Sequence, residues 1–139
     1  MNRRICFCIS AMAVLLSLSP AAWADAQADL GIIFAAQGRF EEARKHLEES
    51  LRVKPEQAGV CSNLGFVLLR LGRIDEAVAE CREALRLDGT SVDAHYNMGM
   101  ALAAGGRRAE AEAEFSKVLT LSLGHAGAQR ALEEMKKPR

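Results

Sequence analysis

A spacing of 34 residues recurs along this chain of 139 residues and constrains its architecture. A Leu-Gly or Met-Gly pair begins at residues 30, 64 and 98, and a Gly-Arg pair begins at residues 38, 72 and 106. Alanine occurs at residues 43, 77 and 111. Small residues kept in one register over three periods indicate a repeated structural unit. A unit of this length cannot bury its apolar face alone, so we expect neighbouring units to stack on one another.

The register divides the chain into units of residues 24–57, 58–91 and 92–125, which follow one another without a linker. In each unit we predict a first helix, a tight turn at the glycine of the Gly-Arg pair, and a second helix. Glycine adopts at little cost the left-handed backbone that ends a helix. The second helices begin with carboxylates, which the helix dipole favours at that end. These are Glu41, Glu42, Asp75, Glu76 and Glu110.

Apolar residues recur in every predicted helix at the three- and four-residue spacing that forms one buried face. They are Leu30, Phe34, Leu64, Leu68, Met98 and Leu102 in the first helices, and Leu47, Leu51, Cys81, Leu85, Phe115 and Leu119 in the second. Where the two helices of a unit cross, we expect Gly31, Gly65 and Gly99 to face Ala43, Ala77 and Ala111. Residues 126–137 form a last predicted helix, which would cover the apolar end of the stack. The alternative is a frayed tail.

The first 24 residues have the features of a secretory signal peptide. Two arginines at residues 3–4 precede an apolar run over residues 5–18, and Ala-Trp-Ala follows a few residues later. This small-x-small pattern predicts cleavage between Ala24 and Asp25. We therefore expect a periplasmic or secreted protein that has no membrane span after cleavage. The alternative is an uncleaved signal anchor.

The repeated pattern resembles the tetratricopeptide repeat, most closely at residues 63–65, 72–77 and 84–85. The resemblance covers residues 25–139, so it implies a single domain with an all-α fold. That fold is a right-handed α-solenoid of three helix-turn-helix units with a capping helix. The chain departs from the family at the fourth position of each unit, where we expect softer packing. A large aromatic residue is replaced there by Gln27, Cys61 and His95.

In this family the first helices line a concave groove that holds a peptide or a helix of a partner protein. The resemblance implies that the groove is lined by Asp29, Ile32, Asn63, Phe66, Leu69, Arg70, Tyr96, Asn97 and Met100. Residues 29, 63 and 97 share one repeat position, and an amide there can donate to and accept from a peptide backbone. The alternative is that Asn63 and Asn97 bond only within the scaffold.

Some members of the family grip a C-terminal carboxylate with lysine, arginine and asparagine side chains. The matching places in this chain hold Ala28, Ile32, Asp93 and Asn97, and Asn63 is the one residue that agrees. The resemblance therefore does not imply a clamp for chaperone tails.

Cys61 and Cys81 are the cysteines that remain after signal cleavage. The register that sets Gly65 opposite Ala77 also sets these two cysteines opposite each other in the second unit. A disulfide forms readily in an oxidising compartment, provided that the Cα atoms lie within about 7 Å. The alternative is two buried thiols that fill space in the core.

Composition and spacing argue against several function classes. The 18 basic and 18 acidic side chains balance, and loss of the two arginines at residues 3–4 would leave a slight negative charge. The chain thus lacks the basic surface that nucleic acid requires. His46, His95 and His125 fall at unrelated repeat positions, and no zinc-ligand spacing, haem-attachment motif or phosphate-binding loop occurs. We predict no metal, no cofactor and no enzyme activity.

The sequence thus favours an exported adaptor or scaffold that binds a protein or peptide ligand in the groove of its first helices. The alternative hypothesis is a structural assembly factor of an envelope secretion or pilus complex. Such a factor would act through the faces of the second helices or through self-association into a homo-oligomer.

Overall fold

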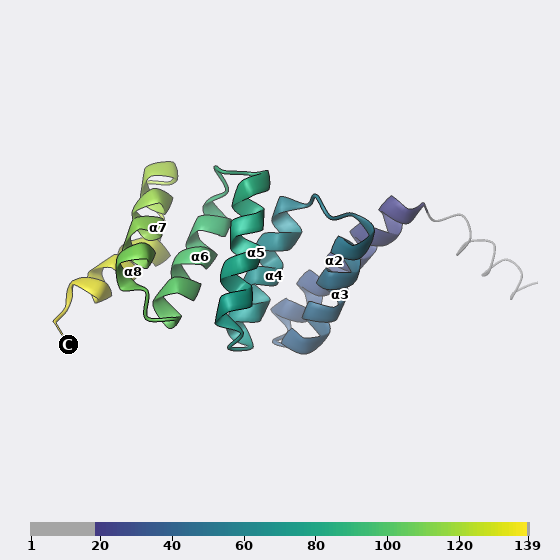
Figure 1. Cartoon of the computed structure of the whole chain (residues 1–139), viewed down its shortest axis with the longest axis horizontal. Helices are drawn as coiled ribbons and strands as arrows, with labels where there is room; N and C mark the ends of the chain where they lie inside the picture. The colour runs from purple at the N-terminus through teal and green to yellow at the C-terminus, as the bar shows by residue number, and fades with distance from the viewer. Residues whose placement is uncertain (1–18, 139) are drawn as a thin grey trace, which may run out of the picture.

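The computed structural model describes residues 19–138, which form seven α-helices and contain no strand (Figure 1). In chain order the helices are α2 (Pro20–Ala36), α3 (Phe40–Val53), α4 (Ala58–Arg70), α5 (Ile74–Leu87), α6 (Val92–Ala104), α7 (Arg108–Leu121) and α8 (Ala126–Lys136). Helix α2 packs against α3, α4 against α5, and α6 against α7, and these three hairpins lie side by side in one elongated row (Figure 1).

The hairpins are joined into one body by contacts between units. Helix α3 packs on α4, α5 packs on α6, and the first helices α4 and α6 also contact each other. Helix α8 packs on α7, and its residue Ala128 is fully buried. The predicted all-α solenoid with a capping helix is therefore confirmed, and α8 takes the place of a frayed tail.

Each hairpin turns at the predicted glycine. The φ angles of Gly38, Gly72 and Gly106 are 75°, 76° and 77°, in the left-handed region that side chains with a Cβ rarely adopt. The glycine N–H donates to the carbonyl three residues earlier, and the next N–H donates to the carbonyl five residues earlier, at 2.9 to 3.1 Å. This pair of bonds is a Schellman motif, which satisfies the last carbonyls of the first helix.

The arginine after each turn glycine is held by a carboxylate at the start of the second helix. Nε and Nη2 of Arg73 donate to Glu76 at 2.7 and 2.6 Å, and Arg107 donates to Glu110 at the same distances. Arg39 pairs with Glu42 in the same way. Because these pairs are exposed, we expect them to orient the turns while contributing little to stability.

The two helices of a hairpin cross closely at the predicted glycines, and Gly31 and Gly65 face the backbone carbonyls of Ala43 and Ala77 as predicted. The nearest side chain across each crossing, however, belongs to a larger residue. A Cβ added to Gly31 would lie 2.6 Å from Leu47, one on Gly65 would lie 2.6 Å from Sγ of Cys81, and one on Gly99 would lie 2.8 Å from the Phe115 ring. These side chains come one helical turn after the alanines at 43, 77 and 111, which are themselves fully buried. The glycines therefore make room for the larger side chains.

Replacing Ala77 with leucine is expected to lower the free energy of unfolding by about 1–3 kcal/mol, because the extra carbon atoms overpack the crossing. Ala77 is fully buried, and its carbonyl oxygen would lie 3.3 Å from a Cβ on Gly65. Urea denaturation followed by circular dichroism measures the effect. The control is Ala79→Leu on the exposed face of the same helix, which we expect to stay within about 0.5 kcal/mol of wild type. Equal midpoints for both variants would contradict this packing.

In the first and third units the fourth position holds a polar side chain that bridges the two helices, whereas in the second unit it holds the buried Cys61. Oε1 of Gln27 lies 2.6 Å from Nδ1 of His46, and Oε2 of Glu114 lies 2.6 Å from Nδ1 of His95. Both pairs join residues 19 positions apart, and the buried His95 ring also contacts the carbonyl of Gly89 at 3.1 Å. Hydrogen bonds thus connect the helices where an aromatic residue was expected.

The prediction that Leu30 is buried was wrong. Leu30 is 39% exposed, whereas Leu64 and Met98, at the same repeat position, are 3% and 8% exposed. Helices α3 and α5 cover that face of α4 and α6, and within residues 19–138 no helix precedes α2 to cover its own. Ile33, three residues further on, is 51% exposed for the same reason. We call Leu30 and Ile33 the open end face.

The predicted signal peptide lies mostly outside the described residues, which begin at Ser19. Helix α2 starts four residues before the predicted unit boundary, with the Ser19 Oγ accepting from the N–H of Ala22 at 3.2 Å. Cleavage between Ala24 and Asp25 would remove this cap and the first helical turn. None of the helices within residues 19–138 combines the length and apolar character needed to cross a bilayer.

Candidate peptide-binding groove

The first helices α2, α4 and α6, followed by α8, form one face of the row, and hollows occur at both of its ends. The first hollow, of about 300 Å³, lies between α2 and α4. It is lined by Ile32, Ala35, Ala36, Asn63 and Phe66. The structure therefore brings together three of the predicted groove residues, those at 32, 63 and 66, from two repeats. We call this the N-terminal hollow.

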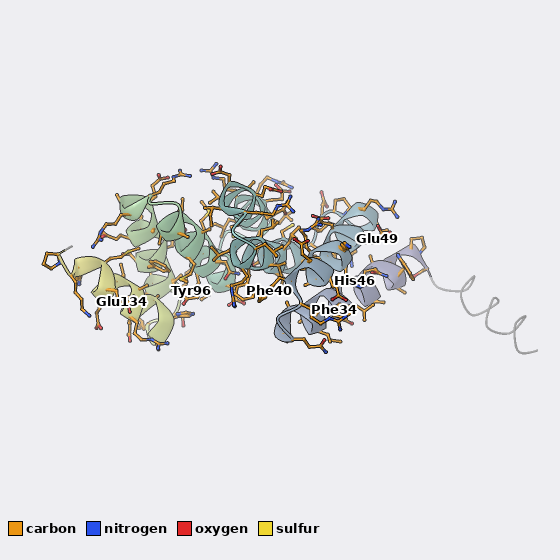
Figure 2. The ribbon with its side chains drawn as sticks, turned by 90° about the horizontal axis from the view of Figure 1, so that it is seen from below. Phe34, Phe40, His46, Glu49, Tyr96 and Glu134 are labelled. Carbon is orange, nitrogen blue, oxygen red and sulfur yellow. The ribbon has the colours of Figure 1, made fainter. Side chains whose placement is uncertain are left out.

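A second hollow, of about 290 Å³, lies between α6, α7 and α8. It is lined by Met100, Ala103, Gly106, Arg108, Phe115, Ala131, Glu134 and Met135. A smaller hollow of about 210 Å³ adjoins it, lined by Tyr96, Met100, Gly127, Arg130, Ala131 and Glu134. We call these two together the C-terminal hollow. Figure 2 shows Tyr96 and Glu134 near each other at this end of the row.

Sequence reasoning missed the contribution of α8, which we had treated only as a cap. Arg130, Ala131 and Glu134 line the C-terminal hollow. They lie 34 residues after Tyr96, Asn97 and Met100, so α8 occupies the place of a fourth first helix. The repeat register, continued past residue 125, would have found them.

Asp29, Asn63 and Asn97, which share one repeat position in the predicted groove, differ in what they contact. Nδ2 of Asn97 donates to the carbonyl and to the Oγ of Ser62, both at 3.2 Å, and so links α6 to α4. The Nδ2 group of Asn97 is therefore bonded within the scaffold, as the alternative hypothesis expects for this residue. Asn63 instead lines the N-terminal hollow, and Asp29 is exposed on α2.

Arg70 and two aromatic rings form a stacked group beside the N-terminal hollow. The guanidinium carbon of Arg70 lies 4.6 Å from the ring centroid of Phe40 and 5.8 Å from that of Phe66. The two rings meet edge to face with centroids 6.3 Å apart. Leu69, the neighbouring predicted groove residue, packs half-buried against the core. The cation–π contact holds the Arg70 side chain in place while leaving it exposed.

Most arginines in the structure lie within 4 Å of a carboxylate. These are Arg39, Arg44, Arg52, Arg73, Arg86, Arg107 and Arg108. Within residues 19–138, Arg82, Arg130 and Arg70 make no such ion pair, and of these three Arg70 is the one stacked on aromatic rings. Its guanidinium N–H groups are therefore available to a ligand.

The two cysteines lie away from the groove and are free thiols in the structure. Cys61 packs with Ala84 and Ala94, while Cys81 lies against Gly65 in the main core. Burial raises the pKa of Cys61 from its ordinary value of 9.0 to about 11 and that of Cys81 to about 12. Burial is the main cause of these raised pKa values, and nearby carboxylates, Glu80 foremost, are the second cause. These thiols fill space in the core, and the predicted disulfide stays a prediction that chemical modification tests.

This helical repeat architecture is found in known proteins. Two family models, both described as tetratricopeptide repeat, match residues 28–92 and 68–134 and so together span most of the chain. The chain belongs to the tetratricopeptide repeat family. A search of curated proteins found no match.

Solved structures share the fold over nearly the whole described chain. One is the second TPR domain of the human RPAP3 protein in complex with the HSP70 peptide SGPTIEEVD, at 28% identity and a TM-score of 0.81, covering 86% of this chain and 100% of that one. The Arabidopsis OM64 TPR domain is 21% identical with a TM-score of 0.83, covering 87% and 100%. The first TPR of Spaghetti (RPAP3), bound to the HSP90 peptide SRMEEVD, is 22% identical with a TM-score of 0.80, covering 83% and 91%.

Proposed function

We propose that this protein is an exported adaptor that binds a segment of a partner protein in the groove between its N-terminal and C-terminal hollows. The observation that carries the proposal is the pair of apolar hollows on the face of the first helices. Ile32 and Met100, one in each hollow, are 46% and 39% exposed although they are large and apolar. Exposed apolar side chains gathered in hollows are typical of a protein interface.

The similarity to the second TPR domain of human RPAP3, which is in complex with an HSP70 peptide, supports a peptide ligand. We propose a ligand that is not recognised by its C-terminal carboxylate. Ala28, Ile32 and Asp93 stand where a clamp would place its cations, and Asn97 is engaged with the scaffold. Export is proposed from the charged start and apolar run of residues 1–24. On that basis the protein would act in the periplasm or outside the cell.

Affinity capture from the native cell envelope tests the proposal. We expect the tagged wild-type protein to retain a partner that an Ile32→Glu/Met100→Glu double variant loses, because a charge in each hollow opposes burial of an apolar ligand. Both residues are exposed, so the double variant should remain folded, which circular dichroism checks. The matched control is Ile33→Glu, on the same helix and 51% exposed but outside both hollows. A partner retained by every variant would overturn the groove as the binding site.

The open end face favours a second candidate, an assembly factor that associates through the end of the solenoid. Leu30 and Ile33 occupy positions that are buried in the other two units. The same capture experiment distinguishes the two candidates. A partner, or a second copy of the chain, that is lost with Ile33→Glu and kept with the double variant would establish association through the open end face.

A further inference from the structure

We propose that the groove takes an extended peptide segment with two bulky apolar side chains six positions apart and a carboxylate between them. This inference rests on the proposed function and specifies its ligand. The two main hollows have nearly equal volumes, about 300 and 290 Å³, and each is lined chiefly by apolar side chains. Burial of one large apolar side chain in each hollow would give the ligand two separate anchors.

The two hollows are joined by a path along the turn-proximal halves of the first helices. Ile32 on α2, Phe66 on α4 and Met100 on α6 share one repeat position and line the hollows. Arg70 lies one helical turn beyond Phe66, so it stands on this path close to the N-terminal hollow. A ligand that leaves the N-terminal hollow along the side of α4 that carries Phe66 would lie within reach of Arg70.

Arg70 favours a negatively charged residue in the part of the ligand that lies between the two apolar anchors. Its guanidinium is held against Phe40 and Phe66 and has no carboxylate partner within residues 19–138. A stacked guanidinium keeps its N–H groups free to donate two parallel bonds to a carboxylate. An aspartate or glutamate side chain of the ligand can accept both of these hydrogen bonds.

Acidic residues of the groove restrict where that carboxylate can lie. Asp29 lies near the middle of α2, one turn before Ile32, and Asp93 lies in the first turn of α6, about two turns before Met100. Asp25 is paired with Lys54 at 3.3 Å. The C-terminal hollow is lined by charges of both signs, Glu134 beside Arg130 and beside Arg108, which is paired with Glu112. Among residues 19–138, no charged residue lines the N-terminal hollow, and the guanidinium of Arg70 packs beside its residue Phe66. We therefore place the acid two positions from the anchor that occupies the N-terminal hollow.

The spacing follows from the helices that the path crosses. Packed helices lie about 8–10 Å apart, and α4 packs directly on α6. Taking that spacing for each step along the first helices, we expect about 16–20 Å between the gap that separates α2 from α4 and the gap that separates α6 from α8. An extended chain rises about 3.3 Å per residue and spans that distance in five to six residues. Side chains alternate between the two faces of an extended strand, so anchors six positions apart lie on the same face. The residue two positions from either anchor lies on that face as well. Asn63, which lines the N-terminal hollow, offers its amide to the unpaired backbone of such a strand.

Synthetic fluorescent peptides test this ligand directly by fluorescence anisotropy. The reference peptide carries two leucines six positions apart in a serine and glycine background, with one aspartate two positions from the first leucine. We expect peptides with leucine spacings of three or four, or with one leucine replaced by serine, to bind at least about tenfold more weakly. Replacing the aspartate with asparagine is expected to weaken binding about threefold to tenfold. A maximum at a spacing of 10 to 12 would indicate a helical ligand and overturn the proposal, as would equal affinity at all spacings.

Variants of the protein assign the contacts. Arg70→Gln should remove the difference between the aspartate and asparagine peptides while leaving the dependence on leucine spacing, and Arg70→Lys should restore part of that difference. Ile32→Glu should weaken every two-leucine peptide, and Ile33→Glu should weaken none. An aspartate preference that persists in Arg70→Gln would overturn the assigned contact. A natural partner lost with Ile32→Glu/Met100→Glu, together with no spacing preference, would leave the proposed function standing and refute this ligand.

Discussion

Replacing Phe115 with alanine is expected to lower the free energy of unfolding by about 3–5 kcal/mol, a large part of the stability of a small domain. Phe115 is the largest of the fully buried side chains within residues 19–138. Its ring packs where Gly99 lacks a Cβ and lies 5.8 Å from the Tyr96 ring, centroid to centroid. Truncation would leave a cavity where α6, α7 and α8 meet, and the surrounding helices relax only partly to fill it.

Urea denaturation followed by circular dichroism measures this loss. The matched control is Leu123→Ala, which removes a large apolar side chain that is 84% exposed and should change the stability by less than about 0.5 kcal/mol. A Phe115→Ala variant that unfolds within about 1 kcal/mol of wild type would show that the third hairpin is not packed as described. Because Phe115 also lines the C-terminal hollow, its truncation is a test of stability and not of ligand binding.

The turns and helix pairing were predictable because they depend on local chemistry repeated three times. A glycine in register at residues 38, 72 and 106 is required by the positive φ of the Schellman turn. The following arginine finds its carboxylate three residues later in every unit, so the pattern identifies both the turn and the start of the next helix. Repetition removes the ambiguity that a single copy of the pattern would carry.

The ends of the stack were less predictable, because a repeat register describes units that have neighbours on both sides. Leu30 matches Leu64 and Met98 in type, yet its exposure depends on a covering helix that the register does not contain. At the other end, α8 was expected only to shield α7, and its contribution of Arg130 and Glu134 to the C-terminal hollow was missed. Exposure at an end is therefore a property of the stack and not of the unit.

The repeat pattern also did not predict which hydrogen bonds the polar side chains make. Asn63 and Asn97 share one repeat position, but Asn97 is engaged with Ser62 while Asn63 lines a hollow. The pairing of Gln27 with His46 and of His95 with Glu114 depends on side-chain reach across a hairpin, which residue spacing alone does not give. The family resemblance predicted which helices line the candidate groove, whereas the contacts of each polar side chain on that face follow from the structure.

In the folded protein, Cys61 and Cys81 are expected to react with iodoacetamide at pH 8 at least about a hundredfold more slowly than in the urea-unfolded chain. The thiolate is the reactive species, and each unit of pKa above ambient pH reduces its fraction about tenfold. Burial raises the pKa of Cys61 to about 11 and of Cys81 to about 12, from an ordinary value of 9.0. Mass spectrometry after timed alkylation measures both rates.

The same experiment decides between free thiols and the predicted disulfide. Two adducts on the unfolded chain without reductant would establish free thiols, as in the structure. No adduct without reductant and two adducts after reduction would establish a bridge between Cys61 and Cys81, and would mean that the helices shift to bring the sulfurs together. Rapid alkylation of the folded protein would contradict the burial of both side chains.

The raised thiol pKa values also predict how stability changes with pH. Between pH 9 and about 11 to 12, the unfolded chain releases its thiol protons while the folded chain keeps them. The unfolded state therefore binds fewer protons in this window, and the free energy of unfolding falls as pH rises through it. Below pH 9 both states hold the protons, and this contribution is fully present. A Cys81→Ala variant removes the larger pKa shift, so its stability should fall less steeply with pH than that of wild type. Parallel slopes for the two proteins between pH 9 and 11 would show that Cys81 ionises as easily in the folded core as in the unfolded chain.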